Sequence, residues 1–103
     1  VNLPIGTATN FNPITIENTG ISDTFSVNVQ DGISNTTGGA VNATWNISEA
    51  IAGDSNVNVS FTWNQTQENG LFNRNTAAVG HYYSTTWNSE SSSIVTGTNP
   101  YTK

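Results

Sequence analysis

Apolar and polar residues alternate with a period of two along three segments of the chain, residues 24–30, 41–48 and 57–63. Successive side chains of a β-strand point to opposite faces of a sheet, so this period predicts strands with one face against a core and one in water. The residues on the apolar phase are expected to be mostly buried. They are Phe25, Val27, Val29, Val41, Trp45, Ile47, Val57, Val59, Phe61 and Trp63.

Shorter segments alternate in the same way, and turn-forming residues separate them. These segments are 3–5, 14–17, 78–84, and 85–88 or 94–96. Pairs such as Asp31-Gly32 and Asn69-Gly70 lie between segments, and such pairs favour turns. Six to eight short strands separated by turns predict one all-β domain over residues 1–103, an antiparallel, immunoglobulin-like β-sandwich.

The composition is typical of an extracellular β protein. Charged residues make up 9% of the chain, against about 25% in an average globular domain, so Asn, Ser and Thr must solvate the surface. We therefore expect a secreted or cell-surface protein. The chain has no cysteine, so packing alone must hold the domain together, and thiol-based zinc sites are excluded.

The net charge of −5 excludes two classes of partner. Arg74 and Lys103 are the only fixed cations, whereas binding phosphates needs a cluster of Lys and Arg. We expect no nucleic-acid binding and no docking on an anionic membrane. Membrane insertion is not expected either, because no segment approaches the roughly 20 apolar residues of a span. Arg74 is expected to form a structural salt bridge with Glu68 or Glu49.

Groups able to carry catalysis are sparse. His81 is the only histidine and has no acid near it in the sequence, so we expect a partly buried sheet residue there rather than a general base. The seven acids do not follow the spacing of a calcium loop. The sequence predicts no enzyme, no cofactor and no metal site, and it leaves open a calcium site on Asp31 or Asp54.

The tryptophans divide into two groups. Trp45 and Trp63 lie on the apolar phase of their strands, which favours the core. Trp87 is near the Ser-rich segment 89–93, and with Tyr82 it is the candidate for exposed rings that stack on a sugar. A carbohydrate-binding module that uses Trp87 and Tyr82 is therefore the first alternative function.

Five Asn-X-Ser/Thr sequons are candidate N-glycosylation sites. With 16 Asn and 27 Ser plus Thr in 103 residues, chance alone gives about four sequons, so their number carries little signal. The candidate residues are Asn35, Asn42, Asn46, Asn58 and Asn64.

Several segments also carry a family resemblance. They are the run AVNATWNISEA at 40–50, residues 56–64 ending in FTWN, ENGLFNR at 68–74, VGHY at 79–82, and the opening and closing segments 3–7 and 97–102. Together they cover nearly the whole chain, and they resemble modules of large secreted proteins of the Bacteroidetes. The resemblance implies a β-sandwich near the C-terminal end of a long adhesin-like surface protein, often ahead of a type IX secretion sorting domain, and it implies no catalytic residue.

In similar sequences the Pro-Tyr-Thr segment at 100–102 continues into one more apolar strand, so the domain is expected to lack a final strand. Its open edge should lie near residues 79–83 and 94–95, and Val1 to Ile5 is the donor available within the chain. We expect a non-enzymatic structural or adhesive module that contacts neighbouring domains or copies of itself. The second alternative is a fibre subunit, a filament assembled by strand donation.

Overall fold

The computed structural model describes residues 1–34, 38–83, 85–90 and 95–103. Within these ranges the chain forms nine strands and one turn of 3-10 helix, and all strand pairs are antiparallel, so the all-β prediction is confirmed. The elements are β1 (Asn2–Leu3), β2 (Ile14–Asn18), β3 (Phe25–Asp31), β4 (Ala43–Glu49), β5 (Val57–Trp63), η1 (Gln65–Gln67), β6 (Val79–Tyr83), β7 (Thr86–Glu90), β8 (Thr96–Gly97) and β9 (Tyr101–Thr102).

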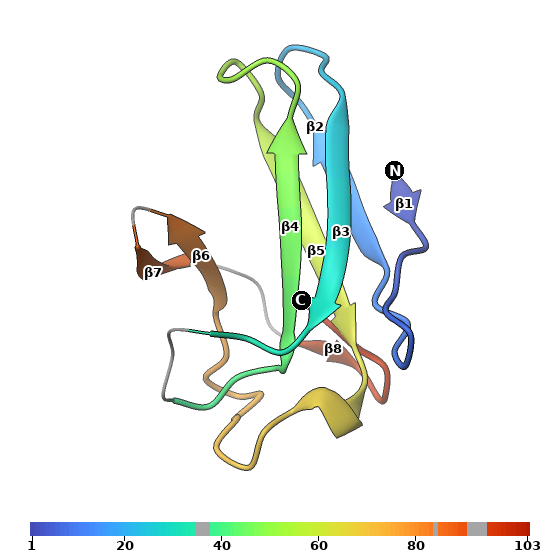
Figure 1. The fold of residues 1–103 in the computed structure, drawn as a ribbon, viewed down its shortest axis with the longest axis vertical. Helices are drawn as coiled ribbons and strands as arrows, with labels where there is room; N and C mark the ends of the chain where they lie inside the picture. The colour runs from blue at the N-terminus through green and yellow to red at the C-terminus, as the bar shows by residue number, and fades with distance from the viewer. Residues whose placement is uncertain (35–37, 84, 91–94) are drawn as a thin grey trace.

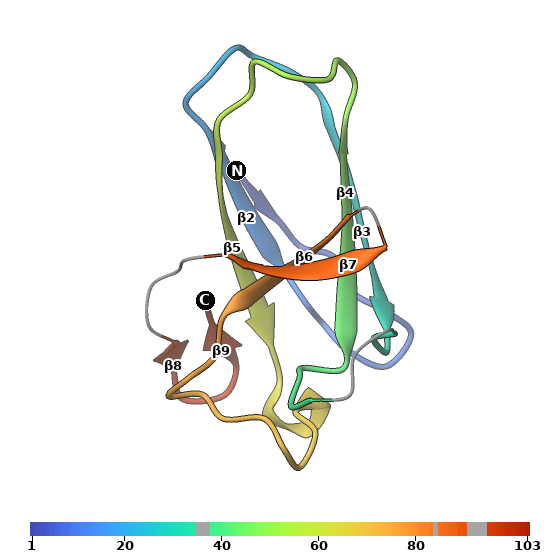
Figure 2. The same cartoon turned by 90° about the vertical axis from the view of Figure 1, so that its left-hand side faces the viewer.

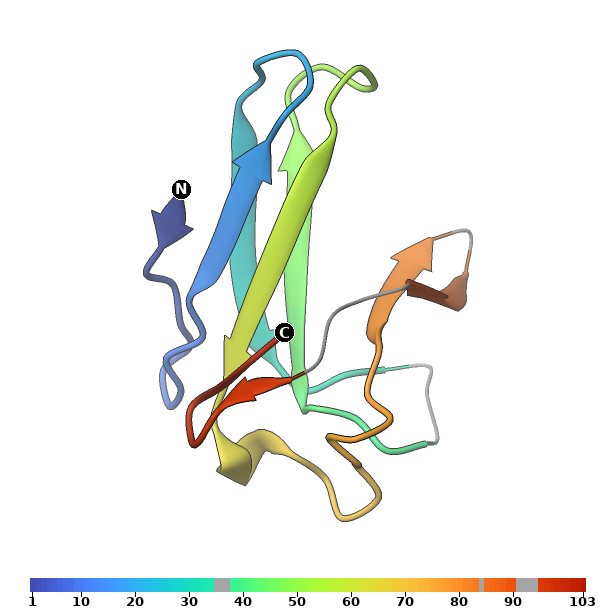
Figure 3. The ribbon, with the colours of Figure 1, turned by 180° about the vertical axis from the view of Figure 1, so that it is seen from behind.

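Two sheets face each other and make a sandwich (Figures 1 and 3). One sheet has the strand order β1-β2-β5-β9-β8, and the other contains β3 and β4. Strands β6 and β7 form a separate hairpin, which crosses one side of the sandwich between β5 and β4 (Figure 2). The more specific immunoglobulin-like topology stays a prediction.

The pairing register places the apolar phase of each strand between the sheets. Val29 lies opposite Trp45 in one sheet, and Ile14 lies opposite Phe61 in the other. The rings of Trp45 and Phe61 meet with their centroids 4.9 Å apart. This contact joins the two sheets, so the direction of the alternating side chains was predicted correctly.

The buried core is smaller than predicted. Among the described residues its apolar members are Ile14, Ile16, Ala43 and Trp63, so Trp63 is the one predicted core residue that is fully buried. Ile47 and Val57 are each 38% exposed, and for these two the prediction was wrong. Alternation tells which face a side chain points to, but a second layer must also cover that face. The other seven predicted residues are half-buried: Phe25, Val27, Val29, Val41, Trp45, Val59 and Phe61.

Both ends of the described chain pair with strands of the same sheet. The amino group of Val1 donates to the carbonyl of Ile16 at 2.6 Å, and Leu3 lies opposite Ile14, so the predicted donor segment is used within its own chain. At the other end, β9 pairs with Thr62 and Trp63 of β5. Of the predicted strand 94–96, Ile94 lies outside the described residues.

Candidate functional site

A buried amide pair fixes the turn that follows β5. Asn12 is 0% exposed and Gln67 is 4% exposed. The Asn12 Nδ2 group donates to Gln67 Oε1 at 2.7 Å, and Gln67 Nε2 donates back to Asn12 Oδ1 at 3.1 Å. Gln67 Oε1 also accepts from the backbone N–H of Asn64 at 2.9 Å. Because buried polar groups are costly unless they are paired, this reciprocal contact holds η1 against the segment that leads into β2.

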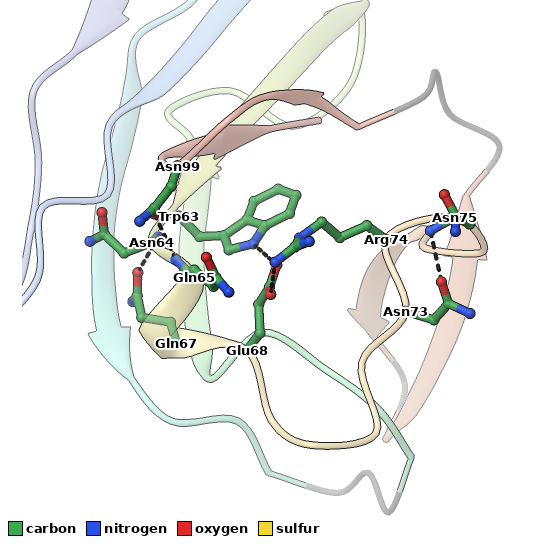
Figure 4. Close-up of polar contacts among 9 residues, drawn as sticks. All are labelled: Trp63, Asn64, Gln65, Gln67, Glu68, Asn73, Arg74, Asn75 and Asn99. Atoms are coloured by element: carbon green, nitrogen blue, oxygen red, sulfur yellow. Dashed lines mark hydrogen bonds and ion pairs between the residues drawn. The ribbon is translucent and has the colours of Figure 1, made fainter.

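The next residue, Glu68, joins β5 to the loop that follows. Arg74 donates to Glu68 through Nε at 2.8 Å and through Nη2 at 2.7 Å, a bidentate ion pair. Trp63 Nε1 also donates to Glu68 Oε2, at 2.9 Å (Figure 4). The predicted salt bridge of Arg74 is confirmed with Glu68, whereas Glu49 accepts from the backbone N–H of Gly53.

The ion pair changes the pKa of both partners. Partial burial raises the pKa of Glu68, but the hydrogen bonds from Arg74 and Trp63 and the charge of Arg74 outweigh it, so the pKa ends below the ordinary value. The hydrogen bonds that Arg74 donates to Glu68 raise the pKa of Arg74. Glu68 therefore stays ionised and remains bonded to Arg74 over the neutral range.

Aromatic rings surround this ion pair. The guanidinium carbon of Arg74 lies 3.9 Å from the centre of the Tyr101 ring, in a cation–π contact. Trp63 meets Phe72 edge-on at 6.0 Å and Tyr101 at 6.2 Å. These contacts tie β5, the 68–74 loop and β9 together.

An open hollow lies beside these contacts, and both fixed cations, Arg74 and Lys103, line it. The charge of Arg74 is already balanced by Glu68.

The structure brings together the two rings predicted to bind sugar. Tyr82 and Trp87 lie directly opposite each other in the β6–β7 hairpin, with ring centroids 5.0 Å apart and planes tilted by 51°. Tyr82 is 40% exposed. Trp87 is half-buried and its Nε1 donates to the carbonyl of Ser34 at 2.9 Å, and its ring lies over Gly80. Of the two rings predicted to be exposed, only Tyr82 is exposed, and the tilted pair presents no flat shared face.

His81 lies in β6 opposite Asn88. It is a sheet residue, as predicted, but its side chain is exposed rather than partly buried. The strand belongs to the β6–β7 hairpin, which does not pair with either sheet of the sandwich within the described residues. In the described ranges, no three acidic or histidine side chains gather in a group that could hold a metal ion.

The two acids considered for calcium lie in different settings. Asp54 is exposed in a turn with a positive φ of 64°. Asp31 accepts hydrogen bonds from Thr7 and Asn10 at 3.0 Å and from Thr9 at 3.1 Å. The bonds from Asn10 and Thr7, with a smaller one from Thr9, lower the pKa of Asp31. Its oxygens therefore anchor the loop between β1 and β2 to the end of β3.

Two of the sequon residues, Asn46 and Asn58, lie on exposed strand positions. Asn42, Asn46 and Asn58 are exposed, and Asn64 is half-buried at the start of η1. The Asn46 side chain donates to Asn28 at 2.8 Å on the outer face of the β3–β4 sheet. Three of the predicted glycosylation sites are thus accessible, while Asn35 lies outside the described residues.

Two contacts escaped prediction from the sequence, the Asn12–Gln67 pair and the stacking of Arg74 on Tyr101. Asn12 shares its phase with Ile14 and Ile16, so the alternation contained a signal that its side chain points inward. No comparable signal marks Gln67 or Tyr101, because their partners are distant in the sequence.

Comparisons with known proteins give no relative from which a function could be carried over. None of the family models, curated proteins and solved structures that were compared matches this chain. Across the part of the chain that the structure describes, no helix is long and apolar enough to cross a membrane.

Proposed function

We propose that this domain is a non-enzymatic structural or adhesive module of a secreted or cell-surface protein. The observation behind this proposal is that two carboxylates, those of Glu68 and Asp31, form hydrogen bonds within the protein itself. Glu68 holds Trp63 and Arg74, and Asp31 holds the loop between β1 and β2. A catalytic carboxylate must be within reach of a substrate and a partner group, whereas these carboxylates are bonded to the protein's own loops.

The surface supports a location outside the cell. Only 9% of the residues in the chain are charged, and exposed strand positions such as Asn28, Asn46 and Ser48 are amides and hydroxyls. Such a surface produces a weak electrostatic field, so it favours contact with neighbouring modules over binding of a charged partner. The resemblance to modules of secreted Bacteroidetes proteins supports the same function.

The proposal is tested with a panel of ester, peptide and glycoside substrates. The wild-type domain is compared with His81→Gln and Glu68→Gln, and all three proteins are expected to give the same background rate. Turnover by the wild type that either substitution abolishes would overturn the non-enzymatic assignment. A circular dichroism spectrum of each variant confirms that it is folded.

A carbohydrate-binding module is the second candidate, and the Tyr82–Trp87 contact is the observation that favours it. Sugar rings stack on exposed aromatic faces, and Tyr82 is the more exposed of the two rings. A glycan array probed with the wild type, Tyr82→Ala and Phe11→Ala tests this candidate. Phe11 is 59% exposed and far from the hairpin in the sequence, so it is the matched control. Binding that is lost only in Tyr82→Ala would establish the sugar site.

A further inference from the structure

Strand β5 has one edge that is paired with β2 and a second edge that is paired only at its C-terminal end. On the first side, β2 pairs with residues 57–61. On the second side, β9 pairs with Thr62 and Trp63, and Phe61 exchanges two backbone hydrogen bonds with Lys103, at 2.6 and 3.0 Å. In the described part of the chain, no strand pairs with the rest of this second side.

The backbone groups on the open stretch can be assigned from the register. In an antiparallel ladder, alternate residues direct both N–H and C=O to the same neighbour. Phe61 directs its pair toward Lys103, so Val59 and Val57 direct theirs to the same side, beyond the end of β9. Two donors and two acceptors therefore continue the β5–β9 ladder, and no strand formed by the described residues lies opposite them.

Side chains beside this edge are only partly covered. Val57 lies on the same face of β5 as Phe61 and the buried Trp63, which is the face that meets the other sheet. It is nevertheless 38% exposed, and so is Ile47, which shares the inner face of β4 with Trp45. An additional strand beside β5 would place side chains against these two residues and complete the ladder at the same time.

The open edge lacks the usual protection against pairing. In natural proteins, charged side chains such as Lys, or a Pro, keep edge strands from pairing with another chain. The stretch 57–60 has neither, because it reads Val-Asn-Val-Ser. This edge of β5 is therefore able to pair with an additional strand. The β6–β7 hairpin crosses this side of the sandwich (Figure 2), so a single extended segment, about 4.8 Å wide in a sheet, fits better than a second folded sandwich.

We propose that the β5 edge over Val57–Val59 binds an extended segment of a neighbouring polypeptide, antiparallel to β5. The segment carries apolar side chains opposite Val57 and Val59 and a polar one opposite Asn58, because residues directly opposite each other share a face. This inference rests on the proposed function and deepens it by naming the surface through which one module engages the next.

The test uses the full chain labelled with 15N and two synthetic peptides. The probe is acetyl-Thr-Val-Thr-Val-Thr-amide, and the control, acetyl-Thr-Pro-Thr-Pro-Thr-amide, lacks both N–H groups that would face β5. Millimolar probe is expected to slow amide hydrogen exchange at Val57 and Val59 by about threefold or more. The amides of Val27 and Val29, which point off the outer edge of β3, are expected to be unchanged, and the control peptide should have no effect.

Two variants sharpen the test. Val59→Pro removes an N–H from the β5 edge, and Val27→Pro removes one from the β3 edge at a residue that is also a half-buried valine. The probe should protect Val57 in Val27→Pro but not in Val59→Pro. No protection in the wild type, or protection on β3 instead, would overturn the proposal. So would protection that rises with protein concentration without peptide, because a second copy would then occupy the edge. None of these outcomes changes the substrate panel, which tests the proposed function by itself.

Discussion

The two ends of the sandwich differ, although the same strands run through both. At the closed end, Trp63 of β5 is buried, and so is the amide pair of Asn12 and Gln67. At the open end, Val57 of β5 and Ile47 of β4 face the other sheet but are each 38% exposed. An identical alternating pattern thus produces a core at one end and an uncovered face at the other. Burial depends on what lies beside the two sheets.

The elements that close one end come from distant parts of the chain. Arg74 stacks on Tyr101 and pairs with Glu68, which in turn binds Trp63. At the open end, β9 does not continue along β5 past the Phe61–Lys103 pair. The difference between the ends is therefore the presence or absence of a neighbouring segment beside β5.

Truncation of β5 residues should separate the two ends most strongly. Trp63→Ala is expected to cost about 3–5 kcal/mol of unfolding free energy, because it leaves a large cavity in the closed end. Val57→Ala, on the same face of the same strand, should cost only about 1 kcal/mol. Urea denaturation followed by circular dichroism measures both. Equal losses would show that the two ends are equally covered.

The buried amide pair gives the next largest effect. Asn12→Ala leaves the Gln67 amide buried with one partner fewer, and we expect a loss of about 1–3 kcal/mol. Asn46→Ala removes a similar side-chain bond to Asn28 on the exposed face and should change stability by less than about 0.5 kcal/mol. A double-mutant cycle of Asn12→Ala with Gln67→Ala measures the coupling. Additive losses would mean that the pair does not act as a unit.

The sequence predicted local features of both ends and missed what distinguishes them. Strand positions and the inward direction of Trp45, Val57 and Trp63 follow from a period of two, which is a property of the backbone. The two-residue strands β8 and β9 are too short to produce such a pattern. Whether Val57 is covered depends on a neighbouring strand, and the pattern within β5 contains no information about that neighbour.

The candidate site was predictable to a similar degree. Only a few charges occur in the chain, so Arg74 had few carboxylates to pair with, and Glu68 was among the two expected partners. The stacking of Arg74 on Tyr101 requires residues 27 positions apart to meet, and only the folded sheet brings β9 beside β5. The Tyr82–Trp87 pair was predicted as two exposed rings, but their tilt is set by the hairpin register.

Acid should weaken the closed end through Glu68. Because the folded-state pKa of Glu68 is lowered, its contribution is fully present above the ordinary glutamate pKa of about 4.3 and is lost as the pH falls through the lowered value. Glu68→Gln should therefore be less stable than the wild type at pH 7, and this difference should shrink toward pH 3.

Arg74→Gln supplies the control for this pH dependence. It removes the same ion pair from the other side, so its stability difference from the wild type should shrink over the same range, and the double variant should resemble either single one. Thermal unfolding between pH 3 and pH 7 measures all four proteins. A difference that stays constant with pH would assign the effect of Glu68→Gln to packing rather than to charge.

The smallest expected effect lies at the open end. Threonine has nearly the shape of valine but carries a hydroxyl in place of one methyl group, and this hydroxyl is costly only where water cannot reach it. Val57→Thr should therefore change the unfolding free energy by no more than about 0.5 kcal/mol, whereas Val59→Thr, two residues along the same face and half-buried, should lose about 1 kcal/mol or more. Urea denaturation of the two variants at the same protein concentration measures the difference. Because both substitutions keep the β-branched shape and the backbone N–H, neither strand propensity nor the ladder changes, and exposure is the remaining variable. A loss at Val57 as large as that at Val59 would mean that the open end is already covered in solution, and the strand-binding edge on β5 would then have no free surface to offer.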